Sequence, residues 1–195
     1  MIFTIIGNRN TPAEICNHYV PVVKALLKAG HVGRSGGALG MDHVLTRAIE
    51  ELRAEGFNDF DAAVYIPTRR FNGLHWGNLG HRVHYVGWFK NYAQATEMAS
   101  QYHDVWHLCD EFSRQAHARN MYEVLGTELA VPSDFIITYA KTNRKGIVTG
   151  GTGTAIKLAQ THQIPIFNEY VTSFDELEEF LKERGIENVE LDYGE

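Results

Sequence analysis

Two glycine-rich stretches at the starts of predicted helices are the parts of this sequence best suited to hold a ligand. The first reads Ser35-Gly36-Gly37-Ala38-Leu39-Gly40-Met41-Asp42, and the second reads Gly150-Gly151-Thr152-Gly153-Thr154. Glycine has no Cβ and adopts positive φ readily, so such loops let the backbone approach a ligand closely. The first N–H groups of a helix lack acceptors within the helix and favour an anion, usually a phosphate. The two stretches therefore predict a nucleotide or a nucleotide-like ligand held between them.

Three charged side chains near these loops have both a ligand-binding and a structural interpretation. Arg9 follows the first predicted strand, where it is either an anion contact or a surface arginine. Arg119 is either a phosphate contact or one half of a structural ion pair. Asp42 either contacts a ribose hydroxyl or stabilises the start of the helix that follows it, where a carboxylate is favourable. We favour anion contact for both arginines and leave the two roles of Asp42 open.

Five motifs in the same order resemble the SLOG group of nucleotide-binding Rossmann domains. The first loop resembles the SGxAxGxD loop of DprA/Smf proteins, and the region around the second resembles the LOG phosphoribohydrolases. The chain is most similar to the small DprA-like and YpsA-like proteins of bacteriophages and bacteria. The matching residues are Gly7-Asn8-Arg9, residues 35–42, residues 118–126, residues 133–137 and residues 150–155. The resemblance covers roughly residues 2–168 and implies a fold and family, but not a reaction.

The resemblance to LOG enzymes, which cleave the N-glycosidic bond of a nucleotide, fails at one position. Arg119 matches the arginine of their H-x-R-K helix motif, but Lys157 stands at the glutamate of their PGGxGTxxE loop and Thr149 at its proline. Cleavage develops positive charge on the sugar, which a carboxylate stabilises and a lysine does not. If the chain is such an enzyme, the catalytic candidates are Arg119 with Asp42 or Glu123 as substitute carboxylates.

We therefore predict a protein that binds a nucleotide or nucleotide-derived molecule as a sensor, a sequestering protein or a processing protein. The first alternative is a LOG-like phosphoribohydrolase or transferase, and the second is DprA-like single-stranded DNA binding. We expect no cofactor and no metal site, and the resemblance implies a homo-oligomer. The predicted ligand-binding residues are Gly7, Asn8, Arg9, Ser35, Gly36, Gly37, Gly40, Asp42, Arg119, Asn120, Gly150, Gly151, Thr152, Gly153 and Thr154.

The elements that would position these residues alternate between strands and helices. Apolar runs predict strands at residues 2–7, 31–34, 61–67, 133–139 and 164–168. Helical spacing predicts helices from Pro12 to before Gly30, from about Met41 to Ala54, at residues 93–102 and 113–125, and from the second glycine-rich stretch to about His162. A last helix is predicted to begin at Ser173 and end before Gly185. This alternation predicts an α/β fold, a single doubly wound Rossmann-like domain over residues 1–195 with a mainly parallel sheet of about five or more strands.

Residues 68–91 interrupt this alternation. They contain four basic residues and several aromatic residues, and no acidic residue. One interpretation is a lid whose arginines clamp phosphates and whose aromatic rings stack on a base, since long insertions in compact domains are often functional. The other is a packed surface excursion whose aromatic residues fill the core. We expect Trp88 and Phe89 in the core. We favour the lid by a small margin.

Histidine is frequent in the sequence, but we expect no metal site from its spacing. His103-Asp104-Val105-Trp106-His107 has the i, i+4 spacing of a zinc-binding helix. Aspartate replaces the glutamate of that motif, and no third ligand is evident. Cys109 lies beside two acidic residues, which do not favour a reactive thiolate.

Composition and net charge limit the kinds of partner that we expect this chain to bind. The chain has 195 residues and a net charge of −6, and residues 169–195 carry −8 of it as an acidic C-terminal helix and tail, so the remainder carries +2. A nucleic-acid binder usually has a strongly basic face, so DNA ranks last among the expected partners. Two cysteines, no secretory signal and no membrane-spanning run predict a cytoplasmic protein without a membrane partner.

Overall fold

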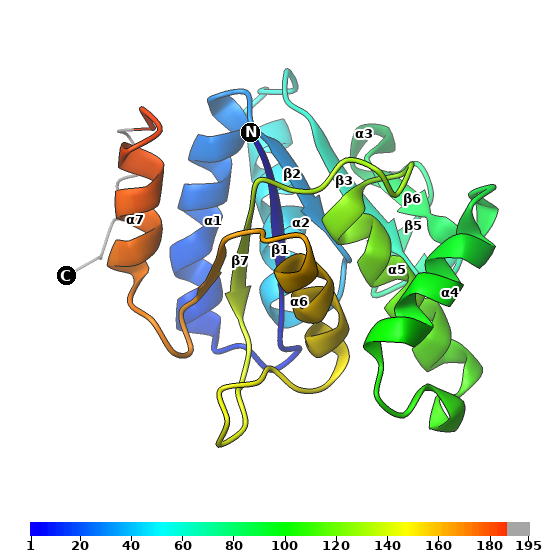
Figure 1. The fold of residues 1–195 in the computed structure, drawn as a ribbon. Helices are drawn as coiled ribbons and strands as arrows, with labels where there is room; N and C mark the ends of the chain where they lie inside the picture. Colours follow the sequence, from blue (N-terminus) through cyan, green and yellow to red (C-terminus); the bar gives the residue numbers. More distant parts are fainter. Residues whose placement is uncertain (187–195) are drawn as a thin grey trace.

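Six parallel strands form one sheet in this computed structural model, which describes residues 1–186 (Figure 1). Residues 187–195 of the predicted acidic tail lie outside the described part of the chain. The strands lie in the order β6-β3-β2-β1-β7-β8, and every neighbouring pair is parallel. Their bounds are β1 (Ile2–Gly7), β2 (Val32–Ser35), β3 (Ala62–Ile66), β6 (Val83–Tyr85), β7 (Phe135–Tyr139) and β8 (Ile166–Asn168). The predicted α/β fold with a mainly parallel sheet is confirmed.

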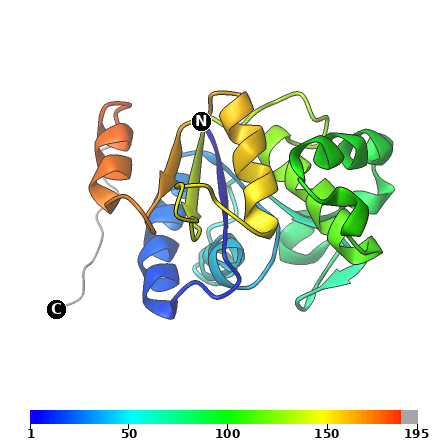
Figure 2. The ribbon, with the colours of Figure 1, turned by 60° about the horizontal axis from the view of Figure 1, so that its bottom comes forward.

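Helices cover both faces of the sheet, because successive strand residues point to opposite sides and both sides are apolar. Ile5 packs in the core on the side of α1 and α2, and its neighbour Ile6 packs in the core on the side of α5 and α6. Figure 2 shows these two pairs of helices on opposite sides. The first face is covered by α1 (Ala13–Lys28), α2 (His43–Ala54) and α7 (Phe174–Lys182); the second is covered by α5 (Glu111–Leu125) and α6 (Gly151–Thr161), with α4 (Tyr92–Tyr102) packed on α5.

The segment of residues 68–91 is not one insertion. Its first part is a short hairpin of β4 (Arg70–Phe71) and β5 (Leu74–His75), followed by the single turn α3 (Asn78–His81). Its end supplies β6 to the main sheet and a 3-10 turn at Val86–Trp88, which the sequence analysis did not predict. Trp88 was expected in the core, but its ring is 55% exposed and packs against Tyr85 and Trp76. The lid hypothesis therefore concerns the hairpin alone.

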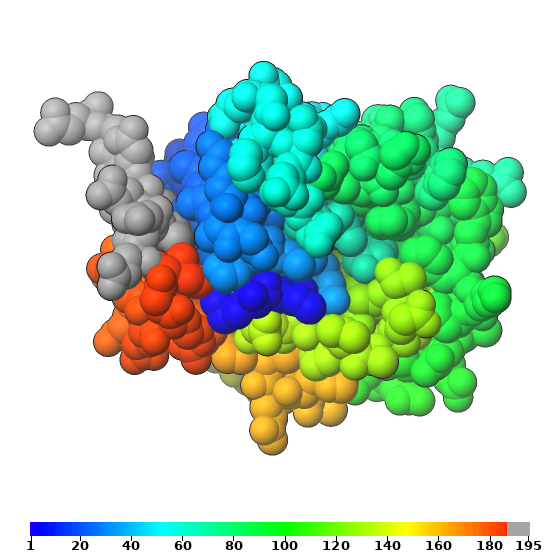
Figure 3. All heavy atoms as spheres, turned by 90° about the horizontal axis from the view of Figure 1, so that it is seen from above, coloured from blue at the N-terminus to red at the C-terminus, as the bar shows by residue number. Residues whose placement is uncertain are grey.

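The strand order reverses between β1 and β7, which is where doubly wound folds bind their ligands, at the carboxyl ends of the strands. These ends point toward the bottom of Figure 1, where the loop between β7 and α6 projects. At the opposite end the N-terminal residues lie between segments from near residues 30 and 130 (Figure 3). There the amino terminus contacts Nδ1 of His31 at 3.1 Å, and the Ile2 amide donates to Asp134 at 2.6 Å. These contacts hold the first residues of the chain against His31 and Asp134 at the amino-terminal end of the sheet.

Among residues 1–186, we find no helix that is both long and apolar enough to cross a bilayer.

Candidate functional site

A pocket of about 180 Å³ lies at the carboxyl edge of the sheet, beside the point where the strand order reverses. It is lined by the loop after β1, by parts of both glycine-rich loops and by two residues of α5. These segments are far apart in sequence and meet because the carboxyl ends of parallel strands share one edge. The lining residues are Ile6, Gly7, Asn8, Arg9, Ala38, Asp42, Arg119, Asn120, Thr149, Gly150, Gly151 and Thr152.

Other atoms of the protein occupy the space beside the glycines of the first loop. A Cβ on Gly36 would overlap the guanidinium of Arg119, and a Cβ on Gly40 would overlap the carbonyl oxygen of Asn8. Gly40 also has a φ of +74°, which side chains disfavour. A Cβ on Gly37 would lie 2.9 Å from Leu74. This loop is therefore closed by protein atoms on the sides where its glycines were expected to admit a ligand.

A buried cluster of three charged side chains lies under the first loop. Nη1 of Arg119 contacts Oδ2 of Asp42 at 3.1 Å and Oε1 of Glu123 at 2.9 Å. The Gly7 amide donates to Oδ1 of Asp42 at 3.0 Å, which ties the cluster to the end of β1. Both Glu123 oxygens are fully buried and make no well-directed hydrogen bond. Arg119 therefore has the ion pairs that the structural interpretation predicts, while it also lines the pocket.

Burial determines the protonation of the two acids. It raises the pKa of the Glu123 carboxyl well above its ordinary value, and the nearby Asp42 adds to this while Arg119 opposes it. Burial also raises the pKa of Asp42, against the opposing effects of Arg119 and of the Gly7 amide. Burial thus favours the neutral form of both acids, and the Arg119 guanidinium favours their ionised forms.

The start of the second loop is open. A Cβ on Gly150 or on Gly151 would meet no atom within 4 Å, and no side chain caps the N-terminus of α6. Gly150 has a φ of +75°, which turns the chain into the helix. Nδ2 of Asn120 donates to the Gly151 carbonyl at 2.8 Å and anchors the loop to α5. The Gly153 amide donates to the Gly150 carbonyl at 3.1 Å, whereas among residues 1–186 no side chain caps the amides of Gly151 and Thr152. Contact of these two amides with a ligand stays a prediction.

Other predicted site residues hold the two loops in place, although Gly153 and Thr154 also line an adjoining pocket. Oγ of Ser35 donates to the Asp42 carbonyl at 2.8 Å, which closes the first loop. Gly153 lies against the carbonyl of Val148, and Oγ1 of Thr154 contacts Nδ1 of His117 at 2.9 Å. The predicted residues outside the pocket lining are Ser35, Gly36, Gly37, Gly40, Glu123, Gly153 and Thr154. Their direct contact with a ligand stays a prediction.

Arg9 is an exposed cation on the pocket wall. Among residues 1–186 no carboxylate lies within ion-pair distance of its guanidinium. Lys157, by contrast, contacts Oδ1 of Asp104 at 2.6 Å in an adjoining pocket of about 490 Å³. The two pockets share Thr149 and Gly150. Arg9 therefore lines the smaller pocket without an ion-pair partner among residues 1–186, and its contact with an anion stays a prediction. The ion pair of Lys157 places the Asp104 carboxylate in the adjoining pocket.

The comparisons with known proteins concern the fold. No protein-family model matches the chain, and no curated protein matches its sequence. DNA processing protein A from Helicobacter pylori, whose structure concerns its single-stranded DNA binding mode, matches with a TM-score of 0.50 and 18% identity, over 97% of this chain and 76% of that one. The Moco carrier protein of Chlamydomonas rheinhardtii matches with a TM-score of 0.44 and 13% identity, over 94% and 83%. The chain thus has the Rossmann-like fold of DNA processing protein A, which confirms the resemblance at the level of fold.

Proposed function

We propose that this chain binds a nucleotide or nucleotide-derived molecule in the pocket between the loops after β1 and β7, and that it senses, sequesters or processes this ligand. One observation carries the proposal: at the reversal of strand order, the pocket joins Arg9, which has no ion-pair partner among residues 1–186, to a helix start without a side-chain cap. Free amides at a helix start favour phosphate, and an arginine adds charge-assisted hydrogen bonds. Together these groups fit a phosphate flanked by Arg9 and Gly151.

The two adjoining pockets suit a ligand larger than phosphate. Small-molecule sites usually measure about 300 to 1,000 Å³, and the pocket of about 180 Å³ alone is below this range. Extension past Thr149 and Gly150 into the pocket of about 490 Å³ would accommodate a sugar and a base. The carboxylate of Asp42 lines the smaller pocket, where it can accept a ribose hydroxyl. The phosphate would then anchor the ligand at the second loop.

The positions of Asp42 and Glu123 agree better with binding of an intact ligand than with glycosidic cleavage. Of the two substitute acids, Asp42 lines the pocket, whereas Glu123 is fully buried outside its lining. Asp42 is already bonded to Arg119 and to the Gly7 amide, so it is poorly placed to stabilise a cationic sugar. Glycosidic cleavage remains the first alternative and is tested by the release of free base.

The test is to incubate purified protein with a nucleotide panel, separate bound from free molecules by ultrafiltration, and identify both by mass spectrometry. The panel contains nucleoside monophosphates, cyclic dinucleotides, NAD and ADP-ribose derivatives. We expect at least one to be retained intact. Release of free base would instead support the glycosidase alternative. Retention of none, with salt-sensitive binding of single-stranded DNA, would overturn the proposal in favour of DNA binding.

A matched pair of variants then tests the location of the site. Arg9→Ala removes the unpaired cation of the pocket, and we expect affinity for the retained ligand to fall by about tenfold or more, since a charge-assisted hydrogen bond contributes about 1.5–3 kcal/mol. Arg144→Ala removes an exposed cation from the nearby loop between β7 and α6, outside both pockets. It should leave affinity unchanged. Equal losses in both variants would indicate a diffuse charge effect and not this pocket.

A further inference from the structure

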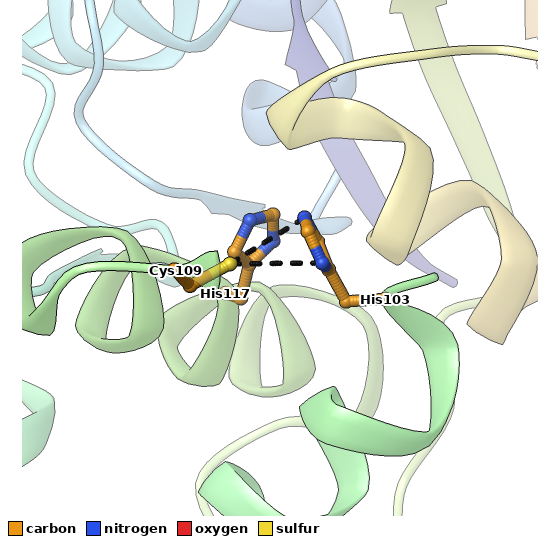
Figure 4. A group of neighbouring side chains, drawn as sticks. All are labelled: His103, Cys109 and His117. Carbon is orange, nitrogen blue, oxygen red and sulfur yellow. Dashed lines mark hydrogen bonds between the residues drawn. The ribbon is translucent and has the colours of Figure 1, made fainter. Parts of the chain in front are cut away.

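Three side chains with metal-binding atoms meet at one end of α5. His103 directly follows α4, Cys109 lies just before α5, and His117 lies within α5. Figure 4 shows the thiol of Cys109 and the two imidazole rings directed toward one another. One ligand atom from each lies within 4.8 Å of the others, and no other such group of three occurs among residues 1–186. The fold therefore gathers a thiol and two imidazoles that the sequence keeps on three separate elements.

The spacing suits a cation better than it suits a hydrogen bond. Sγ of Cys109 lies 3.6 Å from Nδ1 and 3.8 Å from Nε2 of His103, which are long contacts for a thiol donor. Around tetrahedral zinc, with bonds of about 2.3 Å to sulfur and about 2.0 Å to nitrogen, neighbouring ligand atoms lie roughly 3.5 Å apart. The Cys109–His103 separations are close to that value. All three ligand atoms lie within 4.8 Å of one another, so side-chain rotation would be needed to bring them onto one ion.

Contacts behind the ring of His117 orient it for this role. Its Nδ1 lies 2.9 Å from Oγ1 of Thr154 on α6, and the ring is 7% exposed. When Nδ1 donates this hydrogen bond, Nε2 carries the lone pair that a cation needs. Metal-bound histidines commonly have such a partner on the second nitrogen. His103 and Cys109 are only partly buried, which leaves a path for an ion to enter.

We propose that His103, Cys109 and His117 bind one zinc-like transition-metal cation, with a fourth position left for water or for a ligand group. The mixed sulfur and nitrogen donors select such a metal over Mg²⁺ or Ca²⁺, which prefer oxygen. Three protein ligands and an open position are typical of reactive zinc sites. His103 also lines the larger pocket together with Thr154, so the ion would lie at the wall of that pocket. This site stands on its own residues and does not depend on the proposed nucleotide.

Titration of the reduced protein with Co²⁺ tests the site, because cobalt reports its ligands by absorption. We expect one equivalent to bind with a thiolate charge-transfer band and the strong visible bands of tetrahedral cobalt, and Zn²⁺ to displace it. Cys109→Ser should abolish the charge-transfer band, and His103→Ala should abolish tight binding. Thr154→Val should weaken binding by about 10- to 100-fold while the spectrum is kept, since it removes only the partner of His117.

His107→Ala is the matched control, because it removes an exposed histidine two residues from Cys109 that is not in the cluster. It should bind Co²⁺ as the wild type does. Thermal unfolding followed by circular dichroism checks that each variant folds, and Zn²⁺ should raise the melting temperature of the wild type but not of Cys109→Ser. Absence of the thiolate band in the wild type, its persistence in Cys109→Ser, or equal loss in His107→Ala would overturn the proposal.

Discussion

The two glycine-rich loops have similar compositions and opposite surroundings. In the first, Gly36 and Gly40 lie so close to protein atoms that a Cβ on either would overlap them. In the second, Gly150 and Gly151 have open space where a Cβ would be. Both loops begin helices and both contain glycines with positive φ. The difference shows that a glycine-rich helix start can either be filled by atoms of the protein or stay open.

The first loop serves the site indirectly. Its glycines let Arg119 pass under the backbone to reach Asp42 and Glu123, and that cluster holds the end of β1 through the Gly7 amide. The second loop is itself held from behind by Asn120 of α5. The helix α5 supplies both Arg119 and Asn120, so it contacts the closed first loop and the open second loop. Changes at the first loop should therefore act on stability, and changes at the second should act on binding.

The largest expected effect is that of Arg119→Met, which removes the cation of the buried cluster. Asp42 and Glu123 would be left buried without their partner, and breaking such a pair destabilises a protein by about 3–5 kcal/mol. Urea unfolding measures the loss. Arg114→Met is the control on the same helix, because its guanidinium is exposed and stacks on Trp106; it should change stability by less than about 1 kcal/mol. Similar losses in both variants would contradict a central role of the cluster.

A matched pair of alanine variants tests the contrast between the loops directly. Gly40 and Gly150 have φ values of +74° and +75°, so alanine strains the backbone about equally at both positions. Only at Gly40 does the new Cβ also overlap the Asn8 carbonyl. Gly40→Ala should therefore lower the free energy of unfolding by about 1–3 kcal/mol more than Gly150→Ala does, which is the usual effect of overpacking. Equal losses would show that backbone strain alone distinguishes these glycines from other residues.

Glu123→Gln tests the protonation of the cluster through pH. Because the pKa of Glu123 is raised in the folded state, the folded protein keeps a proton that the unfolded chain releases above its ordinary pKa near 4.5. Wild-type stability should therefore fall as pH rises from that value toward the raised pKa. Glutamine does not titrate, so the variant should lose less over the same range. Parallel unfolding curves for the two proteins between about pH 5 and about pH 8 would show that Glu123 is ionised in the folded state.

The smallest effect on stability is expected from Gly151→Ala at the open loop. Alanine is about 1 kcal/mol better than glycine within a helix, and no atom obstructs its Cβ, so stability should stay constant or rise by up to about 1 kcal/mol. The added methyl group would cover the start of α6, so retention of the nucleotide should fall. Thermal melts and the ultrafiltration assay measure the two effects. A large loss of stability would mean that this loop is closed like the first.

The predictions from sequence were accurate where a local pattern carried the information. The apolar runs at β1 and β7 and the helical spacing of α1, α2 and α5 were located within a few residues of their observed bounds. The strand β6 was missed because it is only three residues long and lies in an aromatic segment without alternation. Trp88 was assigned to the core from its apolar character, but its ring packs on other aromatic rings at the surface.

The group of His103, Cys109 and His117 shows another limit of sequence spacing. The sequence analysis weighed only His103 with His107, because i, i+4 spacing puts two side chains on one helix face, and expected no metal site; α4 has ended at Tyr102, so this face does not exist. The residues near His103 are Cys109 and His117, which reach it from a loop and from the next helix. In the sequence this group shows only as Cys109 between His103 and His117, and the separations of these residues match no helical or hairpin repeat.

The sequence by itself determined the succession of the longer strands and helices along the chain, though not the short strand β6, and the positions of both glycine-rich helix starts, because local periodicity and glycine content encode them. Only the tertiary structure decided which loop is open, since that depends on Arg119, Asn8 and Leu74, which lie far from the glycines in sequence. The same is true of the partners of Arg119 and of the group around Cys109. Packing of distant segments sets burial, charge pairing and access, and none of these has a local pattern in the chain.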